Sequence, residues 1–275
     1  MSHTAFGWAD ESGAHPQAPP FKPILPAGEL PPAVAAALWH GCELGSSTLA
    51  TISSRWDGLD AELPGGGWPL RNLTEVLCAQ PSLLEWRLLA PSLSAIVSKK
   101  RDIIVVGPPK RPHLPGLAQA GIDERHLVWI DVGAPAERLW ATEQLVRANA
   151  GGAVLSWLPQ ARPEQIRRLQ VASQGCDGPV FLLRPESARN EASAAPLRVL
   201  ASFDVDWHVN VRVIKRRGAT HDGCVVLDSI PSGIEAVLTP RLRKPSTVSS
   251  RRGITADALG SASSSEHRRH HVSVS

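Results

Sequence analysis

Residues 59–87 read LDAELPGGGWPLRNLTEVLCAQPSLLEWR, and the rest of the chain is organised around them. Three glycines, Gly65–Gly67, predict a tight connection into the apolar run Thr74–Leu77, which is typical of a buried strand. In a nucleotide-binding core, a phosphate-binding loop would follow directly after such a strand. This stretch is therefore where the chain would show a nucleotide site if it had one.

The residues after the strand lack the chemistry of a phosphate-binding loop. Such a loop has the pattern G-x-x-x-x-G-K-[ST], because its amides turn inward around phosphate, its lysine neutralises charge and its hydroxyl helps to hold magnesium. The chain instead reads CAQPSLLE from Cys78 to Glu85, with neither glycine nor lysine. Pro81 removes an amide donor, and Glu85 would repel phosphate. The sequence thus predicts the frame of a nucleotide-binding core without the residues that hold a nucleotide.

A second requirement for nucleotide hydrolysis also fails in the sequence. An ATPase of this fold needs an acidic residue at the end of a hydrophobic strand, to hold the water shell of magnesium. The corresponding strand, 153–158, carries Ser156 and Trp157 and no carboxylate. We therefore expect a protein that is not an enzyme and has no cofactor. Weak nucleotide binding and a weak residual ATPase activity stay as alternatives.

Composition argues against most other kinds of site. The four cysteines, at positions 42, 78, 176 and 224, show no CxxC or Cys/His ligand spacing, so we interpret them as reduced core thiols and expect no metal. The histidines have no cysteine or carboxylate at nucleophile spacing. No apolar run approaches the roughly 20 residues that cross a bilayer, and the N-terminus lacks a secretory signal pattern. These features predict a cytoplasmic protein that does not bind membranes.

Composition also divides the chain into three parts. Residues 1–30 are rich in proline with few aliphatic side chains, which predicts a disordered segment. Residues 31–239 form the predicted folded domain. Residues 240–275 predict a disordered tail rich in Ser, Arg and His, with seven Lys or Arg and two Asp or Glu. The tail thus contributes +5 to a net charge of +3, and residues 1–239 contribute about −2. The basic character of the chain therefore belongs to the tail and is weak support for DNA binding by the folded domain.

Continuous apolar runs alternate with helical patterns over most of the folded domain, which predicts an α/β fold with a mostly parallel central sheet flanked by helices. Near the end, residues 207–215 alternate apolar and polar side chains, which predicts antiparallel strands there. The expected strands are 74–77, 102–106, 127–130, 153–158, 180–183, 197–203, 207–215 and 224–227. The expected helices are 33–40, a short turn at 56–60, 82–99, 114–120, 135–149 and 163–175.

Six short motifs carry a resemblance to a known family. They are ALWHG at 37–41, LDAELPGGGWP at 59–69, LSWLP at 155–159, RRLQ at 167–170, LRP at 183–185 and KRRG at 215–218. With these motifs the chain resembles the ImuA-type accessory proteins of translesion DNA synthesis, which are RecA-like without being recombinases. The resemblance spans about residues 31–227 and implies a RecA-like core.

The resemblance also implies a role in SOS-induced mutagenesis without any chemistry of the protein's own. The family works with a catalytically inert Y-family polymerase homologue of the ImuB type, which binds the sliding clamp, and with an error-prone C-family polymerase. RecA and DNA are further candidate partners, and a nucleoid-associated location is implied. Residues 146–185 also look like SulA, the SOS inhibitor of the division protein FtsZ. A SulA-like division inhibitor is therefore the alternative function.

Basic residues are the first candidates for contact with a partner or with DNA. Two of them follow Pro163 on a helix, where a solvated helix face is the alternative interpretation. Four more crowd at the end of a strand and in its following turn, where they would repel one another without an anion nearby. The alternative there is a charged sheet edge that prevents aggregation. These residues are Arg167, Arg168, Arg212, Lys215, Arg216 and Arg217.

Tryptophans are the second group of candidates, because the chain has nine of them and no tyrosine. Trp68 and Trp86 are candidate exposed residues where a nucleotide would otherwise sit, and exposed tryptophan commonly anchors protein interfaces. Core packing is the alternative for both. Apolar sequence contexts predict that Trp39, Trp129, Trp140 and Trp157 belong to the core.

Overall fold

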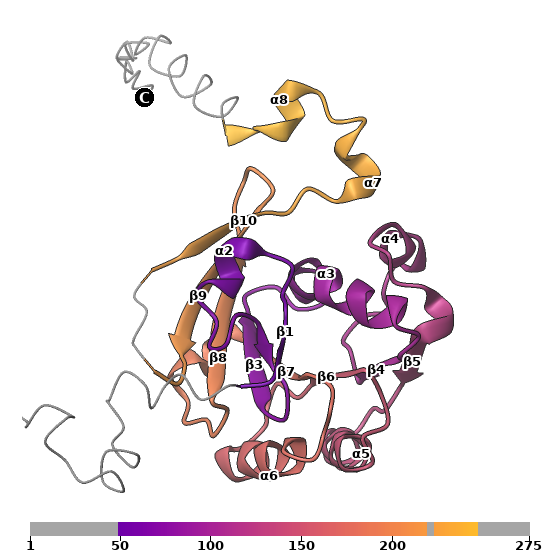
Figure 1. Cartoon of the computed structure of the whole chain (residues 1–275), viewed down its shortest axis with the longest axis vertical. Coiled ribbons are helices and arrows are strands. Elements are labelled where there is room, and N and C mark those ends of the chain that lie inside the picture. The colour runs from indigo at the N-terminus through magenta and orange to yellow at the C-terminus, as the bar shows by residue number, and fades with distance from the viewer. Residues whose placement is uncertain (1–48, 219–222, 247–275) are drawn as a thin grey trace, which may run out of the picture. The chain divides into compact units, whose positions relative to one another are not determined.

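An eight-stranded sheet forms the centre of the computed structural model, which describes residues 49–218 and 223–246 (Figure 1). Its strand order is β10-β9-β8-β3-β7-β6-β4-β5, and the six strands from β8 to β5 run parallel, while β9 and β10 add to β8 in antiparallel pairs. The strands are β3 (Leu73–Cys78), β4 (Ile103–Val106), β5 (Leu127–Ile130), β6 (Ala153–Trp157), β7 (Val180–Pro185), β8 (Leu197–Phe203), β9 (His208–Lys215) and β10 (Val225–Asp228). The mostly parallel α/β class is confirmed, as are the antiparallel strands near the C-terminal end.

Helices cover both faces of the parallel part of the sheet. Helices α3 and α4 lie on one face and α5 and α6 on the other (Figure 1). The core forms two clusters accordingly, one that includes Leu88 and Leu93 of α3 and one that includes Ile166 and Leu169 of α6. The helices are α2 (Asp57–Asp60), α3 (Leu84–Ser98), α4 (Leu114–Gln119), α5 (Pro135–Arg147), α6 (Pro163–Ser173), α7 (Ser232–Glu235) and α8 (Pro240–Arg243), with 3-10 turns η2 (Glu124–His126) and η3 (Glu186–Asn190).

Strand β3 lies between β7 and β8 and is buried along its whole length. Successive side chains of a strand point to opposite faces, so Val76 and Cys78 pack in the cluster of α3 while Leu73 packs in the cluster of α6. A strand buried on both faces reads as a continuous apolar run, which is why the sequence located it.

The glycine run before β3 has a steric cause. It turns the chain between β1 (Thr51–Ile52) and β2 (Trp68–Pro69), which pair in a separate two-stranded sheet. Gly65 and Gly66 have φ of +79° and +78°, in the left-handed region that favours glycine. At Gly67 a Cβ atom would lie 2.4 Å from the carbonyl oxygen of Ile52, so that no side chain fits.

The structure changes the expected boundary of the C-terminal tail. Residues 240–243 form α8, and the indole Nε1 of Trp207 donates to the carbonyl oxygen of Leu242 at 2.9 Å. Asp206 accepts a hydrogen bond from the backbone N–H of Ser246 at 2.8 Å, and the hydrogen bonds from Ser246 lower the pKa of this carboxyl. Tail residues up to 246 therefore belong to the described structure. The expected segment 1–30, the helix 33–40, the motif ALWHG with Trp39, and Cys42 lie outside the described residues.

Candidate functional site at the start of helix α3

The candidate site is the connection from β3 to α3, where a nucleotide-binding core would place its phosphate loop. Ser82 has φ of +82°, and the N-cap residue Leu83 offers no side-chain hydrogen bond to the helix that begins at Leu84. The first turn of a helix has N–H groups without intrahelical partners and a partial positive charge, so it attracts negative charge. The question is which group meets that charge here.

A carboxylate of the chain itself occupies the first turn of α3. Glu85 is only 1% exposed. Its Oε1 accepts a hydrogen bond from the indole Nε1 of Trp157 at 3.1 Å, while its Oε2 is buried and has no partner among the described residues. Buried carboxylates are costly unless they are paired, so this arrangement is unusual. The negative charge of Glu85 stands at the helix end that would otherwise favour phosphate.

Trp157 ends β6 at the position where an ATPase would carry its metal-binding acid. Its ring lies 6.1 Å from that of Trp86, at an interplanar angle of 36°. The preceding Ser156 is buried and shares a hydrogen bond of 2.6 Å with Thr142 of α5. A hydrogen bond between Trp157 and Glu85 therefore joins the two places where a nucleotide site would need a phosphate-binding loop and a metal ligand. We call Cys78, Glu85, Trp86 and Trp157 the Glu85 cluster.

Cys78 lies in the same cluster and is protected from reaction. Burial raises the pKa of its thiol far above the usual range, and the negative charge of Glu85 raises it further. Since the thiolate is the reactive form, a buried thiol with a raised pKa is inert. Cys224 is exposed, so the prediction of a core thiol is wrong for this residue.

We therefore expect iodoacetamide to modify Cys224 in the native protein well before Cys78. Cys78 should become modified only when the protein is unfolded in denaturant. Peptide mapping by mass spectrometry after timed labelling measures this for each cysteine separately. Equal labelling of Cys78 and Cys224 in the native state would contradict the burial of the Glu85 cluster.

Trp68 and Trp86, the two tryptophans that were candidates for an exposed contact surface, are both buried. Trp68 is fully buried, and its ring meets that of Phe181 edge to face, with centroids 5.5 Å apart. Trp86 is only 8% exposed. A buried ring cannot be a surface contact, so the core-packing alternative holds for both residues.

Two expected core tryptophans outside the Glu85 cluster, Trp140 and Trp129, are less buried than expected. Trp140 is wrong as a core residue, because it is 65% exposed on α5, whereas its neighbour Leu139 packs against the core. The apolar neighbours Leu139 and Ala141 pack against the core, whereas Trp140 lies on another side of the helix. Trp129 on the edge strand β5 is partly buried, while Trp157 is buried as expected.

Arg167 and Arg168 both lie exposed on α6, as expected from the apolar positions of that helix. They differ in their partners. Arg168 forms an ion pair through its Nη2 with Glu143 of α5, which also pairs with Arg147 at 2.8 Å. The carboxylate of Glu143 is almost fully buried between the two arginines. The sequence located Arg168 but gave no sign of this partner.

The four basic residues around the end of β9 do not form one surface. Lys215 donates to the carbonyl oxygen of Ser193 at 2.8 Å, and burial lowers the pKa of its ammonium group. Arg216 donates to the backbone carbonyl of Glu62 and lies 3.4 Å from its carboxylate. Arg212 and Arg217 are exposed. Two of the four are therefore engaged with other loops, which reduces the repulsion expected from the sequence.

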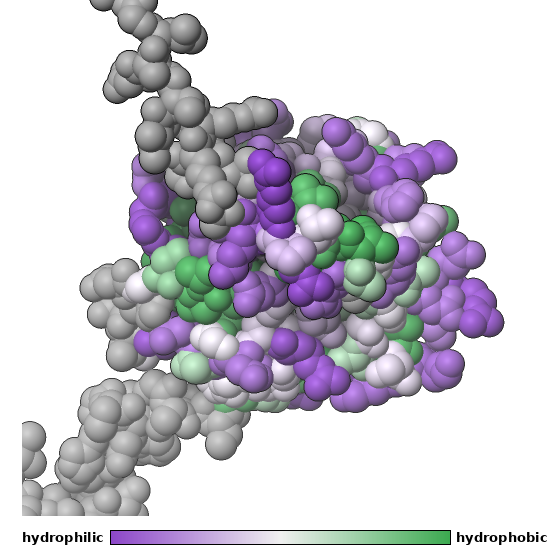
Figure 2. Space-filling model, turned by 90° about the horizontal axis from the view of Figure 1, so that it is seen from above, coloured by the Kyte–Doolittle hydropathy of each residue, from purple (hydrophilic) through white to green (hydrophobic). Residues whose placement is uncertain are grey.

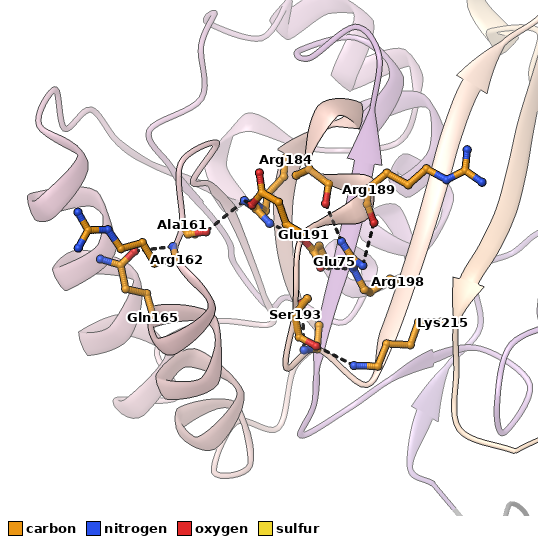
Figure 3. Close-up of polar contacts among 12 residues, drawn as sticks. Glu75, Ala161, Arg162, Gln165, Arg184, Arg189, Glu191, Ser193, Arg198 and Lys215 are labelled. Carbon is orange, nitrogen blue, oxygen red and sulfur yellow. Dashed lines mark hydrogen bonds and ion pairs between the residues drawn. The ribbon is translucent and has the colours of Figure 1, made fainter.

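A buried ionic network crosses the other face of β3 (Figure 3). Glu75 is 0% exposed and binds Arg184 of β7 at 2.9 Å and Arg198 of β8 at 2.5 Å. Arg184 also binds Glu191, and Arg198 donates to the carbonyl oxygens of Ala188 and Arg189 in η3. The network ties the connection between β7 and β8 onto the sheet. Sequence reasoning missed it.

Figure 2, which views the molecule from the top of Figure 1, shows apolar side chains of described residues in small groups between hydrophilic ones. No cluster of three or more His, Cys, Asp or Glu side chains that could hold a metal ion occurs in residues 49–218 and 223–246. Within the same ranges, no helix has both the length and the apolar character needed to cross a membrane.

Comparison with known proteins gives one distant relative to report. No family model matches the chain. The chain is similar to the cell division inhibitor SulA of Photorhabdus laumondii, with 26% identity over 124 residues, which cover 44% of this chain and 70% of that protein. This finding supports the expected likeness to SulA in part of the chain. The likeness to ImuA-type proteins stays a prediction.

Proposed function

We propose that this protein is a non-catalytic, RecA-like accessory protein of SOS-induced translesion DNA synthesis, which acts by binding an ImuB-type Y-family polymerase homologue. The observation that carries the proposal is the Glu85 cluster. It puts a carboxylate at the first turn of α3 and an indole at the end of β6, where phosphoryl transfer would need a lysine-bearing loop and a metal ligand.

The RecA-like part of the proposal draws on the arrangement of β3 and α3. A strand, a loop and a helix in this order form the phosphate-binding unit of nucleotide-binding cores. Here the strand is central and parallel to both neighbours, which agrees with such a unit. We infer that the frame is kept for packing, with tryptophan rings where the nucleotide chemistry would lie.

The cellular part of the proposal draws on resemblance. The six ImuA-type motifs suggest a complex with the polymerase homologue and an error-prone C-family polymerase, with RecA and DNA as further candidates and a cytoplasmic, nucleoid-associated location. The similarity to SulA supports a link to the SOS response. It also favours a second candidate, a division inhibitor that binds FtsZ.

Binding experiments with purified proteins separate the two candidates. The full chain is immobilised and offered the ImuB-type homologue and FtsZ from the same bacterium in parallel. We expect retention of the polymerase homologue. Retention of FtsZ without the polymerase homologue would replace our proposal by the second candidate.

We also expect the purified protein to release no phosphate from ATP above the level of a heat-denatured sample. The physical reason is that Glu85 repels phosphate and that no lysine or metal ligand offsets this repulsion at the candidate site. A malachite green assay with magnesium measures the release. Phosphate release that disappears in a Glu85→Ala variant would show an active, degenerate ATPase instead.

A further inference from the structure

The outer surface of α5 and α6 presents an exposed tryptophan beside fixed arginines. Trp140 is 65% exposed. It lies three residues before Glu143, so the two side chains are neighbours on the same side of α5. The two helices lie side by side on this face of the sheet (Figure 1).

Glu143 orients two arginines. One oxygen of its nearly buried carboxylate accepts a hydrogen bond from Nη2 of Arg147 at 2.8 Å, and the other accepts one from Nη2 of Arg168. Both arginine side chains are still 60% exposed. A guanidinium has five N–H donors, and each of these arginines uses a single nitrogen for Glu143. The remaining donors face solvent in an orientation that is already set.

An apolar side chain completes the surface on α6. Val171 is 58% exposed and follows Arg168 by three residues, so it lies one turn further along that helix. The α5–α6 surface is thus defined by Trp140, Arg147, Arg168 and Val171. Trp and Arg are the residue types that most often dominate the energetics of protein interfaces. Side chains that are ordered before binding lose less entropy when a partner docks.

We propose that the α5–α6 surface docks a protein segment that carries carboxylates flanked by apolar side chains. The carboxylates meet the N–H donors that Arg147 and Arg168 do not use for Glu143, and separate apolar side chains cover Trp140 and Val171. This inference deepens the proposed function and rests on it for the protein used as the first probe.

A protein segment fits this surface better than single-stranded nucleic acid does. Tryptophan and arginine can stack bases and bind phosphate. However, Glu137 on α5 and Glu164 on α6 are also exposed, and Glu143 already offsets part of the positive charge. A continuous phosphate backbone would meet these carboxylates. Discrete carboxylates on a peptide can contact the arginines alone.

The test compares three full-length variants by isothermal calorimetry with the ImuB-type homologue. Trp140→Ala and Arg168→Ala are each expected to weaken binding about tenfold or more. Arg71→Ala is the matched control, because Arg71 is similarly exposed and pairs with a carboxylate, Asp177, at 3.2 Å. It should change binding less than about twofold. Thermal melts verify that all three variants fold.

The possible outcomes distinguish the surface inference from the proposed function. If the wild type binds the homologue and all variants bind equally well, the surface inference is overturned while the proposed function stands. If the wild type binds FtsZ instead, the proposed function fails, and the same variants titrated with FtsZ decide the surface. Binding to neither protein overturns both. Binding of a poly-dT oligonucleotide that is lost in Trp140→Ala would assign the surface to nucleic acid and overturn protein docking.

Discussion

Glu75→Ala is expected to lower the free energy of unfolding by about 3–5 kcal/mol, the range seen when one partner of a buried ion pair is removed. Arg184 and Arg198 are both buried, and each would keep its charge without the carboxylate that offsets it. Among the described residues, Arg184 would keep Glu191 and the carbonyl oxygen of Ala161 as hydrogen-bond partners. Within the same part of the chain, Arg198 would keep the backbone carbonyls of Ala188 and Arg189.

The loss should also loosen the connection that crosses β3. Arg198 holds η3 through two carbonyl oxygens, and η3 joins β7 to β8. Without Glu75 to anchor it, Arg198 would gain solvation by moving outward, and η3 would move with it. In addition to the lower stability, we expect the variant to show a larger increase in amide hydrogen exchange over wild type in residues 186–196 than in β6.

Urea unfolding followed by tryptophan fluorescence measures the change, provided that the transition stays two-state. Glu75→Gln keeps the side-chain shape and removes the charge, so its free energy of unfolding should lie between those of wild type and Glu75→Ala. Asp123→Ala is the control, because it removes an exposed pair with Arg125 in which hydrogen bonding lowers the pKa of Asp123 to about 2. Unfolding of Glu75→Ala at the same urea concentration as Asp123→Ala would contradict a stabilising role of the buried network.

The strands could be predicted because burial on both faces leaves a direct mark on the sequence. Ile103–Val106 and Ala153–Trp157 are apolar runs, and glycines or prolines stand at most of the ends of such runs. Every expected strand appears with its boundaries within two residues of the expectation. Strand order is a different matter, because it depends on which runs pair across long sequence separations.

The ionic network and the tryptophans show where local patterns stop being informative. Glu75 is separated from Arg184 by 109 residues and from Arg198 by 123. No local pattern links residues so far apart, and Glu75 within an apolar run looks like an interruption. The exposure of Trp140 and Trp68 likewise does not follow from their sequence neighbours. Helix phase turns Trp140 outward, while the fold packs Trp68 against Phe181.

The candidate site was predictable by what it lacks and not by what replaces it. The pattern from Cys78 to Glu85 already excludes a phosphate loop, because that conclusion needs only residue types. The partner of Glu85 is Trp157, 72 residues away, and only the fold brings them together. Whether a buried carboxylate there stabilises the fold depends on that partner.

The Glu85 cluster gives the second large expected effect, in Trp157→Phe. Phenylalanine keeps most of the aromatic packing against Trp86 but removes the only hydrogen-bond donor recorded for Glu85 among the described residues. Both carboxylate oxygens would then be buried without a partner. Leaving a charged group unsatisfied costs more than the roughly 1–3 kcal/mol of a neutral one, so we expect a loss of about 3 kcal/mol.

A double-mutant cycle with Glu85→Met separates this hydrogen bond from packing. Glu85→Met removes the buried carboxylate and should cost much less than Trp157→Phe, since apolar replacement of buried charge is often neutral or stabilising. With Met at position 85, Trp157→Phe has no charge to strand and should cost only its packing difference. Urea unfolding of the four proteins gives the coupling, which we expect to be about 1–2 kcal/mol. Additive losses would mean that the contribution of Glu85 to stability does not depend on its hydrogen bond with Trp157.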